Sequence, residues 1–137
     1  MKIKRIFRSN PDTDILHTQI ALSCGQAREV PAELCNVNLN ELLTGHRYGV
    51  LVAEAEGDSM EGKIETGDHV VIDQNIQAKT GDCIIAAVGE DYTIKVFTQK
   101  DDGLYLVANN GKYTPRKITS DDNFDIIGVV THVVKKI

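Results

Sequence analysis

From Gly49 onward, apolar and polar residues alternate in short runs. A period of two is typical of β-strands, because successive side chains of a strand point to opposite faces of a sheet. Gly-Asp, Asp-Gly and Asn-Gly pairs separate the runs, and these residues favour tight turns. The pattern predicts strands at Val50–Ala55, His69–Asp73, Asp82–Val88, Tyr92–Thr98, Leu104–Ala108 and Ile126–Val134.

The first 48 residues lack this alternation, and their apolar residues are sparse and irregular. One short helix is predicted at Asn38–Thr44, where three leucines share a face and Gly45 follows as a stop. We therefore expect a largely extended N-terminal arm over residues 1–48. A compact, mostly β, mainly antiparallel domain is expected over residues 49–137, since no predicted helix is long enough for βαβ crossovers.

Composition places the chain among soluble globular proteins. Its 137 residues are 42% hydrophobic and 26% charged, with a formal net charge of −5. The longest apolar runs are too short to cross a membrane, and a polar stretch follows the basic N-terminus where a signal peptide needs apolar residues. We expect a cytoplasmic protein without a membrane anchor.

Neither a disulfide framework nor a metal site is expected. The cysteines number three, which is odd, and no two have the spacing of a zinc site: Cys24, Cys35 and Cys83. No cofactor is indicated. Residues 51–137 carry 9 basic and 15 acidic side chains, which argues against direct binding to a nucleic-acid backbone. The basic start of the chain, which includes Lys2 and Lys4, is interpreted as a solvated tail.

Two residues interrupt the β-pattern in a chemically suggestive way. Ser59 follows Gly57-Asp58 at a sharp turn, at the start of a possible single helical turn over residues 59–63. Taken alone, Asp58 or Ser59 would cap that turn. Lys95 lies between Ile94 and Val96 in a predicted strand. Taken alone, it would be an edge-strand lysine that discourages aggregation, but if buried its pKa would fall and its neutral amine could act as a general base.

Together, these residues have the order expected of a hydrolase with a serine nucleophile and a lysine base. Beyond this pair, the chain resembles the LexA/UmuD family of self-cleaving serine proteins over essentially all of residues 49–137. The resemblance rests on an ordered set of motifs: Gly57-Asp58-Ser59-Met60, Gly67-Asp68, Val71-Ile72-Asp73, Gly81-Asp82, Thr93-Ile94-Lys95, Asn110, Tyr113-Thr114-Pro115 and Gly128–Val134.

The resemblance implies single-turnover autoproteolysis. Ser59 would be the nucleophile and Lys95 the base, and backbone N–H groups of Asp58 and Ser59 would stabilise the oxyanion. Cys24-Gly25 resembles the cleavage site of the UmuD branch, whereas repressors of the LexA type more often have Ala-Gly. That branch also implies a homodimer, stimulation by a RecA filament on single-stranded DNA, and binding of the trimmed 25–137 form to a UmuC-type translesion polymerase, without sequence-specific DNA binding by this chain.

Other readings stay open at this stage. The chain could be the regulatory domain of a LexA-like or phage-type repressor that lacks its DNA-binding part, or a non-catalytic dimeric β-module. A signal peptidase also uses serine and lysine, but it acts at a membrane. A cysteine hydrolase built from Cys83 with His69 or His132 is the weakest alternative, because Cys83 lies in an apolar run and reads as a buried residue. Whether cleavage occurs within one chain or between two is open as well.

Overall fold

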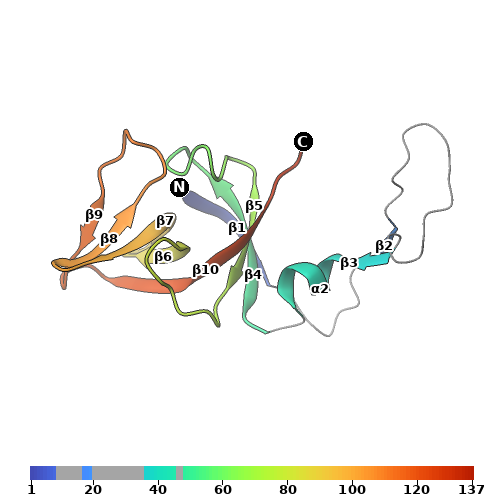
Figure 1. The fold of residues 1–137 in the computed structure, drawn as a ribbon. Helices are drawn as coiled ribbons and strands as arrows, with labels where there is room; N and C mark the ends of the chain where they lie inside the picture. Colours follow the sequence, from blue (N-terminus) through green and yellow to red (C-terminus); the bar gives the residue numbers. More distant parts are fainter. Residues whose placement is uncertain (9–16, 20–35, 46–47) are drawn as a thin grey trace. The chain divides into compact units, whose positions relative to one another are not determined.

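The computed structural model describes residues 1–8, 17–19, 36–45 and 48–137. The chain divides into two compact units (Figure 1). The larger unit comprises residues 1–8 and 49–137, and the smaller unit comprises residues 9–48. The residues after Arg8 therefore leave the larger unit, and the chain returns to it at Gly49.

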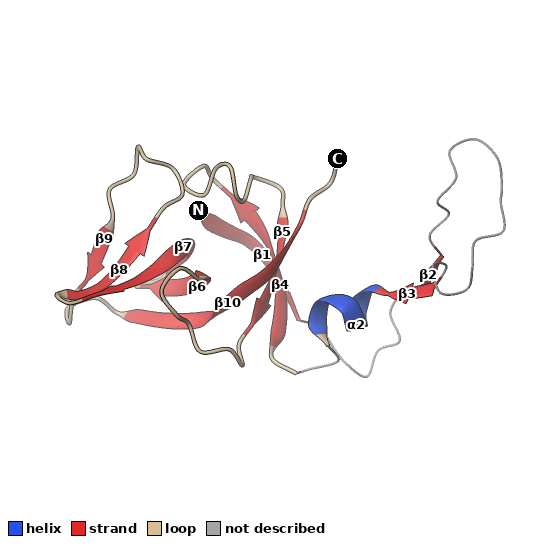
Figure 2. Ribbon diagram, viewed as in Figure 1, coloured by secondary structure: helices blue, strands red, loops and turns tan. Residues whose placement is uncertain are grey.

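The larger unit is built on one antiparallel sheet of eight strands (Figure 2). In sheet order these strands are β1 (Lys2–Arg8), β4 (Val50–Glu56), β5 (His69–Asp73), β10 (Phe124–Val134), β6 (Cys83–Val88), β7 (Asp91–Lys100), β8 (Gly103–Val107) and β9 (Arg116–Ile118). Strand β1 also pairs with β7 through Lys2 and Thr93. The sheet thus curves until its first strand meets its sixth, which closes part of it into a ring.

The predicted fold class, a mostly β antiparallel domain, is confirmed. All six expected strands are present, and their ends lie within two residues of the predicted positions. Two strands of the sheet were not expected from the sequence. Strand β9 is only three residues long, and β1 is rich in lysine and arginine, so neither has a strong alternating pattern. Strand β1 forms because its backbone pairs with the edge of β4.

Side chains between the strands form one main core, which draws on β4, β5, β6 and β7. Its fully buried members include Val70, Ile72, Ile85 and Ile94. Met60 and Ile64, which follow β4, are fully buried in the same cluster. The turn that carries Ser59 is therefore anchored from below by two apolar side chains.

The smaller unit contains a pair of short strands and a helix, described here by themselves. Strand β2 (His17–Gln19) pairs with β3 (Asn36–Asn38), and helix α2 (Leu39–Thr44) follows directly. The predicted helix is confirmed to within one residue, and Gly45 ends it with φ +62°. The leucine face is not fully buried, since Leu42 is 62% exposed. Among the described residues, no helix has the length and apolar character needed to span a membrane.

Candidate functional site

The turn after β4 places Ser59 in the interior. Gly57 has φ +114°, a conformation that suits glycine, and its N–H donates to Thr66 Oγ1 at 2.9 Å. The predicted helical turn is a tight turn in which the Met60 carbonyl accepts the Ile64 N–H at 2.8 Å. Ser59 is only 3% exposed. Its hydroxyl accepts a hydrogen bond from Lys95, a contact that the capping role considered for Ser59 does not explain.

Lys95 reaches the same point from the middle of β7, where it pairs with Ile84 of β6. Its Nζ lies 3.0 Å from Ser59 Oγ, 2.9 Å from Thr93 Oγ1 and 3.2 Å from the Ile94 carbonyl oxygen. None of these three acceptors is a carboxylate. Partial burial removes water from the ammonium and lowers the pKa of Lys95 below its ordinary value. Lys95 thus lines the site from a strand that lies between β6 and β8, and it is not an edge-strand lysine.

This arrangement suits nucleophilic chemistry without histidine. A neutral amine 3.0 Å from a hydroxyl oxygen is within the range for direct proton transfer. Transfer of the Ser59 hydroxyl proton to Lys95 would leave an oxygen nucleophile at Ser59. Thr93, two residues before Lys95 on the same face of β7, orients the amine through its hydroxyl.

A loop after β8 holds the backbone of the Ser59 turn. The Ser59 carbonyl accepts the N–H groups of both Asn109 and Asn110, at 2.8 and 3.0 Å. The Asn110 side-chain amide donates to the Asp58 carbonyl at 3.1 Å, and the Asn109 amide donates to the Glu61 carbonyl at 2.8 Å. The turn is therefore fixed on both sides of Ser59, a form of preorganisation that holds the hydroxyl in place.

The side chain of Asp58 faces this loop as well. It accepts a hydrogen bond from the Tyr113 hydroxyl and forms an ion pair with Lys112. The hydrogen bond from Lys112 and, to a smaller extent, that from Tyr113 lower the pKa of the Asp58 carboxyl. Asp58 is therefore charged at neutral pH and belongs to the support of the turn.

The N-terminal strand reaches the site from a third direction. The Met1 carbonyl accepts the Ile94 N–H at 2.9 Å and the Thr93 hydroxyl at 2.9 Å. The Met1 amino group donates to Ser59 Oγ. Burial, followed by the hydrogen bond and charge of Lys95, lowers the pKa of this amino group to about 5. Met1 is 6% exposed, and it lines a cavity that Ser59 and Lys95 also line.

In the structure, the two candidate residues Ser59 and Lys95 are in hydrogen-bond contact, and Asp58 precedes Ser59 in the same turn. The expected cleavage site at Cys24-Gly25 lies outside the described residues. Sequence reasoning did not assign roles to Thr93, Asn110 or Met1. Thr93 could have been noticed because residues 93 and 95 of a strand lie on the same face. The contact of Met1 depends on strand pairing that no local pattern encodes.

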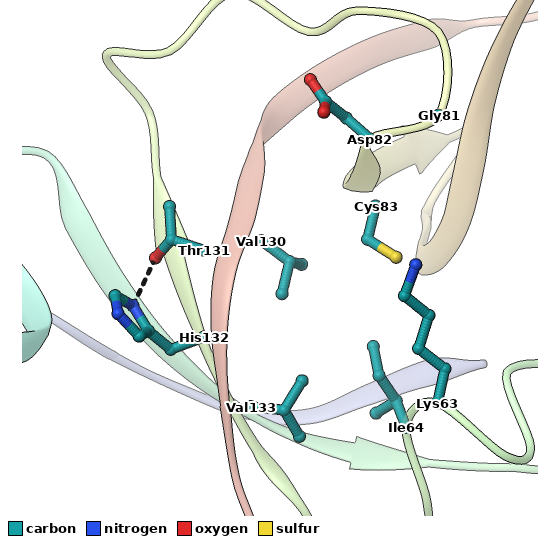
Figure 3. A pocket seen from close by; sticks show the side chains of 9 residues that line it. All are labelled: Lys63, Ile64, Gly81, Asp82, Cys83, Val130, Thr131, His132 and Val133. Atoms are coloured by element: carbon teal, nitrogen blue, oxygen red, sulfur yellow. Dashed lines mark hydrogen bonds between the residues drawn. The ribbon is translucent and has the colours of Figure 1, made fainter.

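A separate pocket is lined by Cys83 and does not include Ser59 among its lining residues (Figure 3). Cys83 is confirmed as a buried residue of the core. The His132 ring lies across β10 from it and makes a 2.9 Å hydrogen bond with Thr131 Oγ1 (Figure 3). The geometry therefore does not support a thiol–imidazole pair of Cys83 with His132. Within the described ranges, no group of three His, Cys, Asp or Glu side chains is placed to hold a metal ion.

Comparison with known proteins identifies the family of this chain. The model of the family described as Peptidase S24-like matches residues 18–131. LexA repressor 2 of Pseudomonas syringae pv. tomato is 32% identical over 127 residues, covering 92% of this chain and 54% of the relative. LexA repressor of Desulfatibacillum aliphaticivorans is 35% identical over 85 residues, covering 60% of this chain and 42% of the relative. The chain thus spans about half the length of these relatives. It belongs to the Peptidase S24-like family.

Proposed function

We propose that this protein is a self-cleaving serine peptidase of the SOS response and that Ser59 and Lys95 carry the reaction. The observation that supports this most directly is the 3.0 Å contact between Lys95 Nζ and Ser59 Oγ inside a water-poor cleft. The lowered pKa of Lys95 supports the same assignment, because the base must be neutral before it can accept a proton.

The proposed reaction begins when neutral Lys95 takes the proton of the Ser59 hydroxyl. The serine oxygen attacks the carbonyl carbon of Cys24, and the oxyanion is stabilised by backbone N–H groups at Asp58 and Ser59. Collapse breaks the peptide bond, and Lys95 gives its proton to the leaving amine of Gly25. Water then hydrolyses the ester between Cys24 and Ser59, which releases residues 1–24 and restores the hydroxyl.

In this proposal, residues 1–48 are the arm that carries the cleavage site and residues 49–137 are the peptidase-like domain. The 25–137 product, as a homodimer in the cytoplasm, joins a UmuC-type translesion polymerase. A RecA filament on single-stranded DNA favours the cleavable state. Resemblance of Cys24-Gly25 to the UmuD cleavage site supports this branch of the family.

A second candidate is the regulatory part of a LexA-type repressor. The similarity to two LexA repressors supports it, since they are 35% and 32% identical to this chain over 85 and 127 residues. The two candidates share the same chemistry and differ in what the product binds. Pull-down of a UmuC-type polymerase by the cleaved form favours the polymerase subunit, whereas retention on operator DNA favours the repressor.

Intact-mass spectrometry tests the cleavage itself. The purified chain is incubated at neutral and alkaline pH, with and without a RecA filament, beside Ser59→Ala. We expect a new mass for residues 25–137 that is absent in the variant. Absence of cleavage under every condition would overturn the peptidase assignment in favour of a non-catalytic module. A different product mass would mean that the scissile bond is not Cys24-Gly25.

A further inference from the structure

Strand β1 binds the site as a peptide ligand would. The carbonyl of Met1, the residue that precedes this strand, accepts two hydrogen bonds from β7, through Ile94 and Thr93. The Met1 side chain is buried in the main core, and Ile3 of β1 packs against the same cluster. From Lys2 onward the strand pairs with β4. An extended segment thus lies beside Ser59. It is held by backbone hydrogen bonds to β7 and by an apolar side chain that is buried in the core.

We infer that the cleft between β4 and β7 is a strand-binding groove for extended peptides with an apolar side chain at the Met1 position, that β1 is its resident occupant, and that the segment to be cut must displace β1. This inference rests on the proposed function for the identity of the second occupant. It assigns residues 1–8 a role as an inhibitor within the chain.

The groove has room for one strand at a time. The two edges of β4 are taken by β5 and β1. The Ile94 N–H has one proton to donate, and it bonds the Met1 carbonyl. Ser59 Oγ, the atom that must reach a scissile carbonyl, contacts the Met1 amino group. A second peptide that adds as a strand beside Ser59 would need these same groups, so the two occupants exclude each other.

Chain length does not prevent the cleavage segment from reaching the groove. Arg8 pairs with Leu51 at the start of β4, the end of that strand that is remote from Ser59. Fifteen residues lie between Arg8 and Cys24, so sixteen Cα–Cα steps join them. Fully extended, they would span roughly 50 Å, about twice the roughly 24 Å length of a seven-residue strand such as β4. Occupancy of the groove, not reach, is therefore the brake.

The incoming segment has suitable chemistry to take over the groove. When β1 leaves, the apolar surface that Met1 and Ile3 cover loses its protection from water. Ala21 and Leu22 precede the expected cleavage site and could cover that surface again. Replacement of the apolar side chains Met1 and Ile3 by Ala21 and Leu22 keeps apolar surface covered in both states, as a switch between two occupants requires.

A disulfide that locks β1 in place tests this exchange in the full chain. Ile3 pairs with Ala55, whose N–H and carbonyl both bond toward β5, to Asp68 and Gly67. Ile3 and Ala55 therefore form a non-hydrogen-bonded pair, in which Cα atoms lie about 4.5 Å apart, close enough for a disulfide. The double variant Ile3→Cys with Ala55→Cys is compared, oxidised and reduced, with each single variant, which retains the three native cysteines.

We expect self-cleavage at alkaline pH to be at least tenfold slower in the oxidised double variant than in the reduced one. The single variants should show no such difference. If oxidised and reduced forms are cut at the same rate, β1 does not need to leave and the inference is wrong. A tenfold effect corresponds to a groove that the reduced strand leaves open at least ten times more often than the locked strand does.

Hydrogen exchange at the Ile94 amide separates this inference from the proposed function. The same double variant, carrying Ser59→Ala so that it stays intact, is compared in its two redox forms. Faster exchange of Ile94 in the reduced form, by tenfold or more, supports a resident strand that leaves the groove, even if the chain never cuts itself. Equal exchange in the two forms would overturn the inference while leaving the peptidase assignment to the mass measurement.

Discussion

Ser59 and Lys95 are 36 residues apart in the sequence, yet their side-chain oxygen and nitrogen lie 3.0 Å apart. The tight turn after β4 brings the hydroxyl inward, and β7 brings the amine to meet it. The pair has no carboxylate among the contacts made by Lys95 and is partly shielded from water. Proton transfer between the two residues therefore depends on how readily Lys95 gives up its charge.

The rate of self-cleavage should follow the titration of Lys95. Because burial lowers its pKa, the neutral fraction should increase about tenfold for each pH unit below that pKa and level off above it. We expect the plateau to begin below pH 10.5, the ordinary value for lysine. Rates measured by intact mass from neutral to alkaline pH test this, and a flat profile would exclude a lysine base.

Lys95→Arg is the matched variant for that profile. It keeps a positive charge and a long side chain, but a guanidinium stays protonated at every pH used. We expect cleavage to fall below detection across the whole range. Lys100→Arg, a change at an exposed end of β7, serves as the control and should retain the wild-type profile.

Asn110 should act on the rate more than on stability. Its side-chain amide donates to the Asp58 carbonyl and to Glu61 Oε2, both at 3.1 Å, and so restrains the turn that carries Ser59. For Asn110→Ala we expect roughly tenfold slower cleavage with an unchanged pH midpoint, since small misplacements of a nucleophile are costly to rate. Lys112→Ala, which breaks an exposed ion pair of the same loop, should leave the free energy of unfolding nearly unchanged. A shifted midpoint in Asn110→Ala would instead indicate an effect on Lys95.

Gly128 is required by packing. A Cβ at this position would lie 2.6 Å from Ile72 Cγ2 and 3.0 Å from the Asp73 carbonyl oxygen. Gly128→Ala should therefore lower the free energy of unfolding by about 1 to 3 kcal/mol, measured by urea denaturation. Gly111→Ala is the control, because a Cβ there would meet no atom within 4 Å and the residue does not have positive φ. Equal effects of the two changes would contradict the packing argument.

Asp68 should contribute stability that depends on pH. It is 4% exposed, and its carboxylate bonds Lys135 at 2.6 Å and the Glu65 N–H at 2.8 Å. Burial opposes its ionisation, but these two bonds outweigh burial and lower its pKa below 3.8. The stabilisation is therefore complete above pH 3.8 and is lost as pH falls through the lower, folded-state pKa.

Asp68→Asn should accordingly destabilise the protein by about 1 to 3 kcal/mol at pH 7 and by less in strong acid. Urea denaturation at pH 7 and near pH 2 measures the difference. Asp121→Asn, at an exposed position, is the control and should change the free energy of unfolding very little at pH 7. A loss for Asp68→Asn that is the same at both pH values would mean that its charge is not the source of the stability.

The sequence alone determined the β-class, six strands to within two residues and the short helix, and it predicted a serine–lysine pair. These features are local or carry ordered motifs, because the alternation of β4 or β6 and the glycine turns are written in neighbouring residues. Only the tertiary structure decided the depth of Ser59, the contacts of Lys95 and the occupation of the cleft by β1. Burial and strand pairing join residues far apart in the chain, as Met1 meets Thr93, and no local pattern specifies which distant edge a basic strand will bind.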